Sequence, residues 1–484
     1  MNSKFFMVAS VSLAVLVSSI AYAQGPGPGP DGEQPPRRGG GGSGLGGYTE
    51  VTESGRVPDH LYNIILGQPT DDSIVVSVLS HQDMTAYLEY GMAGSGYTSK
   101  TDSLEIGPRQ AVNFKIDGLQ KDHQYNYRMQ YQLAGQTGFE SSEQYVFHTQ
   151  RAFDSDFVFT VQADSHLDEN TSGEAYTNAL QNALSNEPDF HLALGDTFMT
   201  DKYIEYQQSE PQYLAQRYYF GTQLTHSAPL FFALGNHDAE GGNAERTQWS
   251  TNTRNKYLPN PGMDDFYSGN PEMTENGDFV RNYYSWEWGN SQFIALDPFR
   301  YSVRVRGGQG GNGNWYMTLG KDQYDWLAET LENSDATFKF VYLHNLVGGA
   351  ASNRGGAEAS LNFEWGGHEF DGTYTFAENR PGWDQPIHDL LVENGVSVVF
   401  HGHDHMYIQQ ERDGIVYQLV PQPGHPSGNV NSAEGYGYLS GNIVQGSGHL
   451  TVSVSEDVVD VEFIDSRANG SGQLLHSYQI QAKN

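Results

Sequence analysis

The stretch PLFFALGNHD, residues 229–238, holds the pattern that decides the fold, because an apolar run ends there at a group of polar residues. The run PLFFAL has the length and composition of a buried strand. One glycine separates it from Asn236, His237 and Asp238. An amide oxygen can bind a metal ion, and an imidazole can donate a proton or stabilise charge on a phosphoryl oxygen. We expect Asp238 to orient the His237 ring and to raise its basicity.

Four further apolar runs end in the same way. FVFTVQA, FHLAL, FKFVYL and VSVVF are each followed by residues that can bind metal ions, which are Asp164, His166, Asp196, His344, His403 and His405. Side chains two positions apart on an extended segment point to the same side. The Asp-x-His segment 164–166 and the His-x-His segment 403–405 can therefore each present two ligands together. We expect His401, at the end of its own strand, to pack beneath the site instead of binding metal.

The five motifs predict one pocket that holds two divalent metal ions. Where strands alternate with helices, ligands bind outside the carboxyl ends of the strands, which is where all five motifs lie. The chain has no cysteine, so oxygen and nitrogen must hold the ions. Mn, Fe and Zn all accept such ligands, and the carboxylate of the Gly195-Asp196 turn could bridge two of them. This arrangement indicates metal-assisted hydrolysis, above all of a phosphate ester.

The charge of the chain limits its partners. The 484 residues include 59 acidic and 26 basic side chains, which gives a formal net charge of −33 at pH 7. Such a surface repels polyanions at long range, so nucleic acid polymers and anionic membranes are not expected as partners. A small phosphorylated substrate can still reach a locally positive metal pocket.

The N-terminus is typical of an exported protein. Residues 1–23 combine a positive start, a short apolar stretch and the small residues of Ala21-Tyr22-Ala23, which indicates a secretory signal peptide. Residues 24–55 are rich in Gly, Pro and Ser and predict a flexible linker. We therefore expect a periplasmic or secreted protein. No other segment is apolar enough to predict a span of the membrane.

The rest of the chain divides into two patterns. Residues 56–150 contain about seven short strand-like runs separated by turn residues, which is typical of a small all-β sandwich. Residues 151–484 alternate strand-like runs with helices that we expect over 174–186, 321–332 and 385–394. This alternation predicts an α/β architecture, and the C-terminal tail predicts β-hairpin strands that close it.

Together, the five motifs resemble the calcineurin-like metallophosphoesterase superfamily, whose pattern is D-x-H, G-D, G-N-H-[D/E], a lone H and G-H-x-H. The elements occur in that order between about residues 155 and 410. The resemblance implies a β-sandwich flanked by helices, with a binuclear metal centre at its edge. It implies that one ion is held by Asp164, His166, Asp196 and His405. It implies that the other ion is held by Asp196, Asn236, His344 and His403, with Asp196 as the bridge.

The all-β region resembles the layout of purple acid phosphatases, in which a fibronectin type III-like domain precedes the catalytic domain. Leu119, Tyr125 and Tyr127 resemble the tyrosine corner of that fold. Two positions depart from these phosphatases, which carry Gly where His166 stands and a metal-binding Tyr where Met199 stands. Without that phenolate a purple ferric site is not expected. A mixed or homonuclear centre of Mn, Fe or Zn is favoured.

These patterns lead us to expect an exported phosphatase that hydrolyses small phosphomonoesters by direct attack of metal-bound hydroxide. A phosphodiesterase or a nucleotidase could use the same site. A non-catalytic surface binding protein is the alternative from another class, and the intact ligand set argues against it. Arg354, in the Gly-rich and aromatic stretch 348–372, could hold a phosphate of the substrate. The sequence leaves the oligomeric state open.

Overall fold

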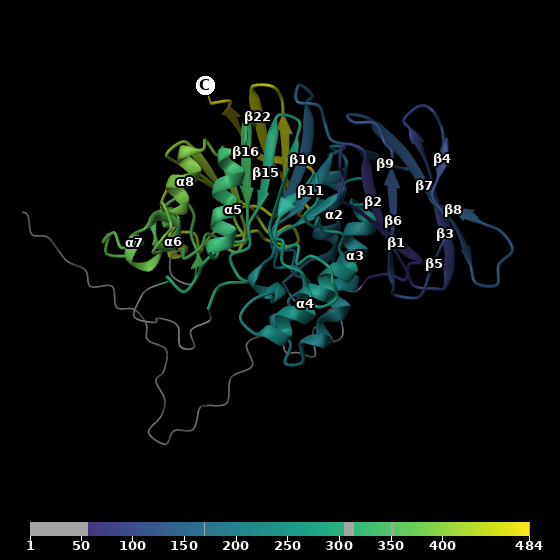
Figure 1. The fold of residues 1–484 in the computed structure, drawn as a ribbon, viewed down its shortest axis with the longest axis horizontal. Coiled ribbons are helices and arrows are strands. Elements are labelled where there is room, and N and C mark those ends of the chain that lie inside the picture. The colour runs from purple at the N-terminus through teal and green to yellow at the C-terminus, as the bar shows by residue number, and fades with distance from the viewer. Residues whose placement is uncertain (1–56, 169, 304–313, 350–352, 484) are drawn as a thin grey trace, which may run out of the picture. The chain divides into compact units, whose positions relative to one another are not determined.

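The computed structural model describes residues 57–168, 170–303, 314–349 and 353–483. The expected signal peptide, residues 1–23, and the expected linker, residues 24–55, lie outside these ranges. The described residues form an all-β sandwich followed by a larger β-sandwich that is flanked by helices (Figure 1). All of them belong to one compact unit.

The first sandwich is built from antiparallel strands with alternating apolar residues. They are β1 Tyr62–Gly67, β2 Ser73–Ser80, β3 Met84–Met92, β4 Ser99–Lys100, β5 Leu104–Ile106, β6 Ala111–Asp117, β7 Gln124–Leu133, β8 Glu140–Ser141 and β9 Tyr145–His148. One sheet has the order β1-β2-β6, and the other has β4-β3-β7-β8, with β5 beside β3 and β9 beside β7. Buried side chains of both sheets, such as Val76 and Met129, form the core between them.

Tyr125, in β7, makes the hydrogen bond that is expected of a tyrosine corner. Its hydroxyl accepts the backbone N–H of Gln120 at 2.8 Å. Tyr127 is fully buried and donates its hydroxyl to the backbone oxygen of His226 at 2.6 Å, which joins β7 to the second sandwich. The fibronectin type III-like assignment and the domain boundary near residue 150 stay predictions.

The second sandwich has a six-stranded and an eight-stranded sheet. The first contains β10 Phe157–Gln162, β11 Phe190–Ala193, β12 Leu230–Phe232, β21 Gly448–Val454, β22 Val458–Asp465 and β23 Leu474–Gln481, in the order β12-β11-β10-β21-β22-β23. The second contains β13 Ser268–Gly269, β14 Tyr284–Trp288, β15 Ser291–Ala295, β16 Phe338–Tyr342, β17 Val398–His401, β18 Tyr407–Arg412, β19 Ile415–Leu419 and β20 Asn442–Val444. Its order is β13-β14-β15-β16-β17-β19-β18-β20.

An aromatic core joins these two sheets. The ring of Phe159 on β10 meets those of Phe293 on β15 and Phe340 on β16 edge-on, with centroids 5.1 and 5.4 Å apart. Edge-to-face pairs of this kind add to the free energy gained from burial. β21 and β22 pair as the hairpin that was predicted for the tail, and β23 follows them at the edge of the sheet.

Helices cover both outer faces of the second sandwich (Figure 1). α2 Gly173–Leu184 and α3 Glu210–Gln223 pack on the six-stranded sheet, and α5 Lys321–Glu332 and α8 Ile387–Glu393 pack on the eight-stranded sheet. The other α-helices within the described residues are α4 Ala244–Tyr257, α6 Phe363–Gly366 and α7 Phe376–Asn379. The predicted fold class, an α/β sandwich flanked by helices and preceded by an all-β domain, is confirmed. In the parts of the chain that the structure describes, no helix is long and apolar enough to cross a membrane.

The first sandwich holds α3 in place. The guanidinium of Arg217, in the middle of α3, is fully buried and donates to the side chain of Asn63 on β1 at 2.9 Å. It also donates to the backbone oxygen of Ser77 on β2 at 3.0 Å. A buried guanidinium with several acceptors fixes a helix more strictly than apolar contact does, because each lost bond leaves a buried N–H donor unpaired at a cost. The all-β region thus supports a helix of the second sandwich.

Parallel pairing brings the motif-bearing strand ends together. β10, β11 and β12 are parallel neighbours in one sheet, and β16 and β17 are parallel neighbours in the other. The carboxyl ends of parallel neighbours lie at the same edge of a sheet, so the loops that follow them meet there.

Candidate metal centre

The loops after β10, β11, β12, β16 and β17 are shaped to bring the predicted ligands together. Four ligands have left-handed backbone conformations, with φ of 56° at Asp164, 52° at Asp196, 77° at His403 and 59° at His405. This region of φ is uncommon for residues other than Gly and costs free energy that the surrounding structure must offset. Such strain collects at functional sites, and here it directs side chains into one pocket.

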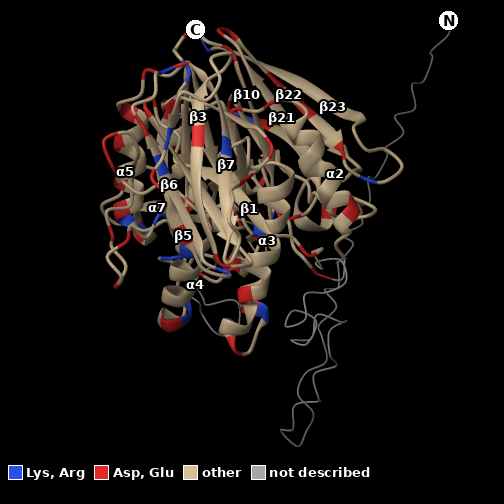
Figure 2. Ribbon diagram, turned by 90° about the vertical axis from the view of Figure 1, so that its right-hand side faces the viewer, with Lys and Arg blue, Asp and Glu red and all other residues tan. Residues whose placement is uncertain are grey.

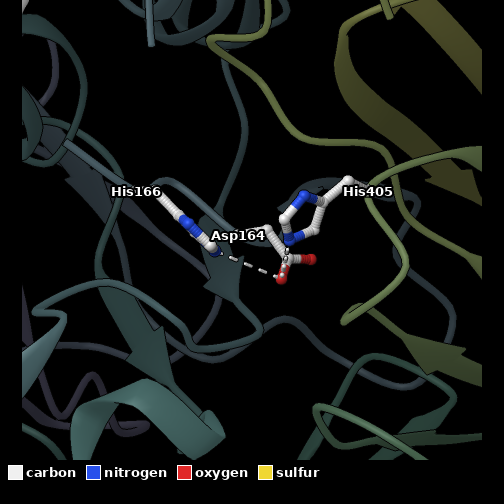
Figure 3. A group of neighbouring side chains, drawn as sticks. All are labelled: Asp164, His166 and His405. Atoms are coloured by element: carbon white, nitrogen blue, oxygen red, sulfur yellow. Dashed lines mark ion pairs between the residues drawn. The ribbon is translucent and has the colours of Figure 1, made fainter. Parts of the chain in front are cut away.

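One group of ligands consists of Asp164, His166 and His405 (Figure 3). Oδ1 of Asp164 lies 3.7 Å from Nε2 of His166 and 3.3 Å from Nε2 of His405. Asp164 and His166 are buried, whereas the His405 side chain is 37% exposed. This group therefore opens to solvent on the side of His405.

A second group consists of Asp196, His344 and His403. Oδ2 of Asp196 lies 3.1 Å from Nε2 of His344, which lies 3.3 Å from Nδ1 of His403. In each group the three candidate ligand atoms lie within 4.8 Å of one another. Metal–ligand bonds of about 2.0–2.3 Å place two ligand atoms at most about 4.5 Å apart, so each group needs only small adjustments to surround one ion.

Asp196 belongs to the second group and also faces the first. Its Oδ1 accepts the backbone N–H of His237 at 2.7 Å. Its Oδ2 faces His344 of the second group and also lies 3.7 Å from Nε2 of His166 in the first. One oxygen is thus fixed by the backbone while the other is presented to both groups, which is the placement that a bridging carboxylate needs.

Three polar atoms of the predicted ligands are buried without a hydrogen-bond partner. They are Oδ1 of Asp164, Oδ1 of Asn236 and Nε2 of His166. Buried polar atoms of folded proteins are nearly always paired, and leaving one unpaired costs about 1–3 kcal/mol. Divalent ions would satisfy all three atoms, because carboxylate oxygen, amide oxygen and imidazole nitrogen are suitable ligands. The residues present therefore fit a metal centre.

Hydrogen bonds behind the ligands set which imidazole nitrogen faces the pocket. Nδ1 of His344 donates to the backbone oxygen of Leu194 at 2.8 Å, which leaves Nε2 to face the pocket. Nδ1 of His166 similarly faces Oδ2 of Asp168 at 3.4 Å. Sequence reasoning did not identify Asp168 as a supporting residue, although it follows His166 by two positions.

The electrostatics of the pocket favour a cation. Burial lowers the pKa of His344, but the carboxylates of Asp196 and Asp164 outweigh burial and raise it to about 9. A pocket that holds a proton this firmly also attracts a metal ion. Burial and the neighbouring His344 lower the pKa of His403 to about 4, so His403 stays neutral, which is the form that binds metals.

Two glycines allow the loops after β11 and β12 to touch. A Cβ on Gly195, where φ is +87°, would lie 2.2 Å from the backbone N of Gly235. A Cβ on Gly235 would lie 2.0 Å from the backbone N of Asp196. Only glycine permits such an approach of two backbones, so these positions set the spacing between the Asp196 and Asn236 ligands.

The predicted role of Asp238 is wrong. Asp238 is buried, and its carboxylate does not contact the His237 ring. Its oxygens accept four backbone N–H groups at 2.7–3.0 Å, which belong to Asp196, Thr197, Phe198 and Gly235. The cause is local, because residues Asn236–Asp238 form a 3-10 turn that points Asp238 inward. Asp238 therefore holds the loop backbone instead of orienting His237.

Asp201 takes the place that was predicted for Asp238. Nδ1 of His237 donates to Oδ1 of Asp201 at 2.7 Å, and the His237 side chain is 19% exposed. Asp201 lies in a 3-10 helix, Thr200–Lys202, that follows Met199 in a left-handed conformation. The role of Asp201 was hard to predict from the sequence, because Asp201 lies five residues beyond Asp196 and outside every strand-end motif.

Replacing Asp201 by Asn should slow turnover without removing metal. The amide cannot stabilise a charged His237 ring as the carboxylate does, and loss of such a supporting group typically costs about 10–100-fold. We expect kcat to fall by about that factor while the metal content stays at the wild-type value. Steady-state kinetics and elemental analysis of the same preparation measure both. An unchanged kcat would remove Asp201 from the account.

Three other predicted positions are placed as follows. His401 is buried, burial lowers its pKa to about 4, and it belongs to neither ligand group. Met199 is buried against Tyr203. Arg354 forms an ion pair with Asp404 and lies over the ring of Tyr436, 4.1 Å from its centroid. Arg354 therefore holds the turn between His403 and His405, and its contact with a substrate phosphate stays a prediction.

Comparison with known proteins identifies the family of the chain. The family model described as calcineurin-like phosphoesterase matches residues 157–407, which is more than half of the chain. The chain therefore belongs to the calcineurin-like phosphoesterase family. It is a metal-dependent phosphoric ester hydrolase, and the enzymes of its family use divalent metal ions.

One solved structure shares the fold at low sequence identity. The structure of PhoD has 14% identity and a TM-score of 0.64, over 88% of this chain and 92% of that one. GAP50, the anchor in the inner membrane complex of Plasmodium, has 12% identity and a TM-score of 0.38, over 68% of this chain and 90% of that one. No curated protein sequence matches the chain.

Proposed function

We propose that the chain is an exported phosphatase that hydrolyses small phosphomonoesters at a centre of two divalent ions. The observation that carries the proposal is the position of Oδ2 of Asp196, 3.1 Å from His344 and 3.7 Å from His166. A carboxylate oxygen between two groups of imidazoles suits two ions held close together. One ion would be held by Asp164, His166 and His405, and the other by Asn236, His344 and His403.

The residues around the centre have separate tasks in this proposal. When bound, the ions would supply a water of lowered pKa and would neutralise charge on the phosphoryl oxygens. His237 is partly exposed beside the ligands, and its Nε2 lies 3.9 Å from Oδ2 of Asp196. With Nδ1 tied to Asp201, the ring can hold a proton at Nε2 for the leaving alkoxide. The Asp201 carboxylate stabilises the charged ring while it holds that proton.

The charge distribution supports a small substrate. The chain carries 59 acidic and 26 basic residues, and Figure 2 shows Asp and Glu on helices and strands of both sandwiches. An acidic surface disfavours nucleic acid polymers, whereas a small ester can approach the cationic centre on the open side at His405. A phosphodiesterase or a nucleotidase remains the second candidate at the same site. Parallel assays with an aryl phosphate, a bis-aryl phosphate and a nucleoside monophosphate separate the candidates. A faster diester reaction would favour a phosphodiesterase, and a preference for the nucleoside monophosphate would favour a nucleotidase.

Export is proposed from the sequence of residues 1–23 alone. Cells that express the full chain with a C-terminal tag can be fractionated, and the mature N-terminus can be sequenced. We expect a periplasmic or secreted product that begins at Gln24. A cytoplasmic product that retains residues 1–23 would contradict the proposal.

Metal removal is the most direct test of the proposed chemistry. A strong chelator should abolish phosphate release, and adding Mn²⁺ or Zn²⁺ back should restore it as the second ion binds. Phosphate release and metal content are measured along the same titration. Full activity of the metal-free protein would contradict the mechanism. A metal-replete protein that is inert toward every phosphorylated compound would favour the alternative of a surface binding protein.

A further inference from the structure

The side chain of Gln216, on α3, contacts two of the metal-ligand loops at once. Its Nε2 donates to the backbone oxygen of Ser165 at 2.8 Å and to that of Thr197 at 3.0 Å. Ser165 stands between the ligands Asp164 and His166, and Thr197 follows Asp196 directly. One amide group therefore ties the loop of the first ligand group to the loop of the bridging carboxylate.

The orientation of this amide is fixed by its partners. Both neighbours of Nε2 are carbonyl oxygens, which only accept, so the NH₂ group must face them and use both of its protons. Oε1 accepts the hydroxyl of Tyr176 at 2.9 Å, and that hydroxyl also accepts Nε2 of Gln162 at 3.3 Å. Gln216 and Tyr176 are fully buried. The contact is thus fully satisfied and shielded from water, which makes it rigid.

The helix that carries Gln216 is itself anchored. The next residue, Arg217, is buried and bonded to β1 and β2 of the first sandwich. A continuous set of contacts therefore runs from the all-β region through Arg217 and Gln216 to the two ligand loops. Because the ligand Asp164 and the ligand Asp196 lie on those loops, their spacing depends on this connection.

We propose that Gln216 is a positioning residue that sets the spacing between the two metal ions. The proposal rests on the binuclear centre proposed above. Without the amide, the loops after β10 and β11 lose their shared donor, and the Asp164 and Asp196 carboxylates move independently. The ion held by Asp164 and Asp196 depends on both loops and is then bound more weakly. The other ion takes a ligand from only one of these loops, and its binding does not change.

The test replaces Gln216 by Met, which keeps the volume and removes both donors. Gln223 is a matched control, because it lies on the same helix and its amide bonds to Gln181 and Thr222 instead of to a ligand loop. Tyr176→Phe removes the hydroxyl that orients the amide and is expected to act in the same direction with a smaller effect. Tyr176→Phe also tests the proposal if the Gln216→Met variant does not fold.

The readouts are the two Mn²⁺ dissociation constants, the spin coupling between the ions in electron paramagnetic resonance, and the melting temperature of the metal-free protein. We expect Gln216→Met to raise the dissociation constant of the more weakly bound Mn²⁺ ion about tenfold or more, as for other residues that support metal ligands. We also expect a weaker signal from the spin coupling between the two ions. Gln223→Met should leave both at the wild-type value.

The inference is overturned if Gln216→Met keeps the dissociation constants and the spin coupling of the wild type. This holds even if its melting temperature falls, because a purely structural role of Gln216 would lower only the melting temperature. The wild-type protein separates this failure from that of the proposed function. If the wild type binds a single Mn²⁺ ion and shows no coupled signal, the binuclear centre itself is wrong, and the spacing role of Gln216 is wrong with it.

Discussion

Replacing Asp196 by Ala removes metal and activity together. Its Oδ2 faces His344 and His166, so its loss takes a ligand from both groups at once. Bound ions contribute several kcal/mol to transition-state stabilisation, and each 1.4 kcal/mol is tenfold in rate. We therefore expect kcat/KM to fall by about a thousandfold or more, with less than two ions bound per chain. Phosphate release and elemental analysis measure the two effects.

The same preparation needs a control that separates ligand loss from general damage. Asp71 is exposed in the turn between β1 and β2, so Asp71→Ala changes the same charge without touching the centre. It should match the wild type in metal content and rate. Asp196→Ala with full metal content and full activity would show that Asp196 is not the bridge.

Replacing His237 by Ala lowers turnover and leaves the metal in place. The ring of His237 belongs to neither ligand group, and its Nε2 lies 3.9 Å from the Asp196 carboxylate. Loss of a general acid costs about 10²–10⁴-fold. We expect kcat to fall within that range while two ions remain bound. The loss should be smaller for esters with good leaving groups, because their alkoxide needs less protonation.

A series of aryl phosphates with leaving groups of different pKa measures this dependence. His123→Ala is the control, since His123 lies in the first sandwich, where its ring faces the backbone oxygen of Lys121 at 2.7 Å. An unchanged kcat for His237→Ala would remove His237 from the chemistry. A drop in kcat that is the same for every leaving group would exclude protonation of the alkoxide and leave charge stabilisation as its role.

The elements that the sequence predicted well are those whose apolar residues repeat. The helix expected over 321–332 matches α5, because Tyr324, Leu327 and Leu331 form one buried face. The five motif strands were found for the same reason, since each is a short apolar run. Parallel pairing then fixes where their loops meet, so the ligand residues could be named before any geometry was known.

The elements that escaped prediction bury polar side chains. α3 directs Gln212, Gln216 and Arg217 inward, and α4 buries Arg254 against Glu240. Such residues are stable in the core only because distant segments supply their partners. A repeat of apolar residues along the chain does not reveal such buried polar side chains. The same holds for Asp201, which contacts His237 from 36 positions away in the sequence.

The side-chain direction inside a tight turn was also beyond sequence reasoning. Asp238 follows His237 directly, so an interaction between them was the simplest expectation. The 3-10 turn at Asn236–Asp238 instead turns the carboxylate toward the backbone of the neighbouring loop. The local backbone conformation thus decides which of two adjacent polar residues faces the pocket.

The central claim is that two ions share the Asp196 carboxylate, and a crystal structure of metal-replete protein with anomalous scattering data tests it most directly. We predict two peaks about 3.5–4 Å apart, one beside Asp164 and His405 and the other beside Asn236 and His403, with Asp196 between them. A single fully occupied ion, or two ions that do not both contact Asp196, would contradict the account.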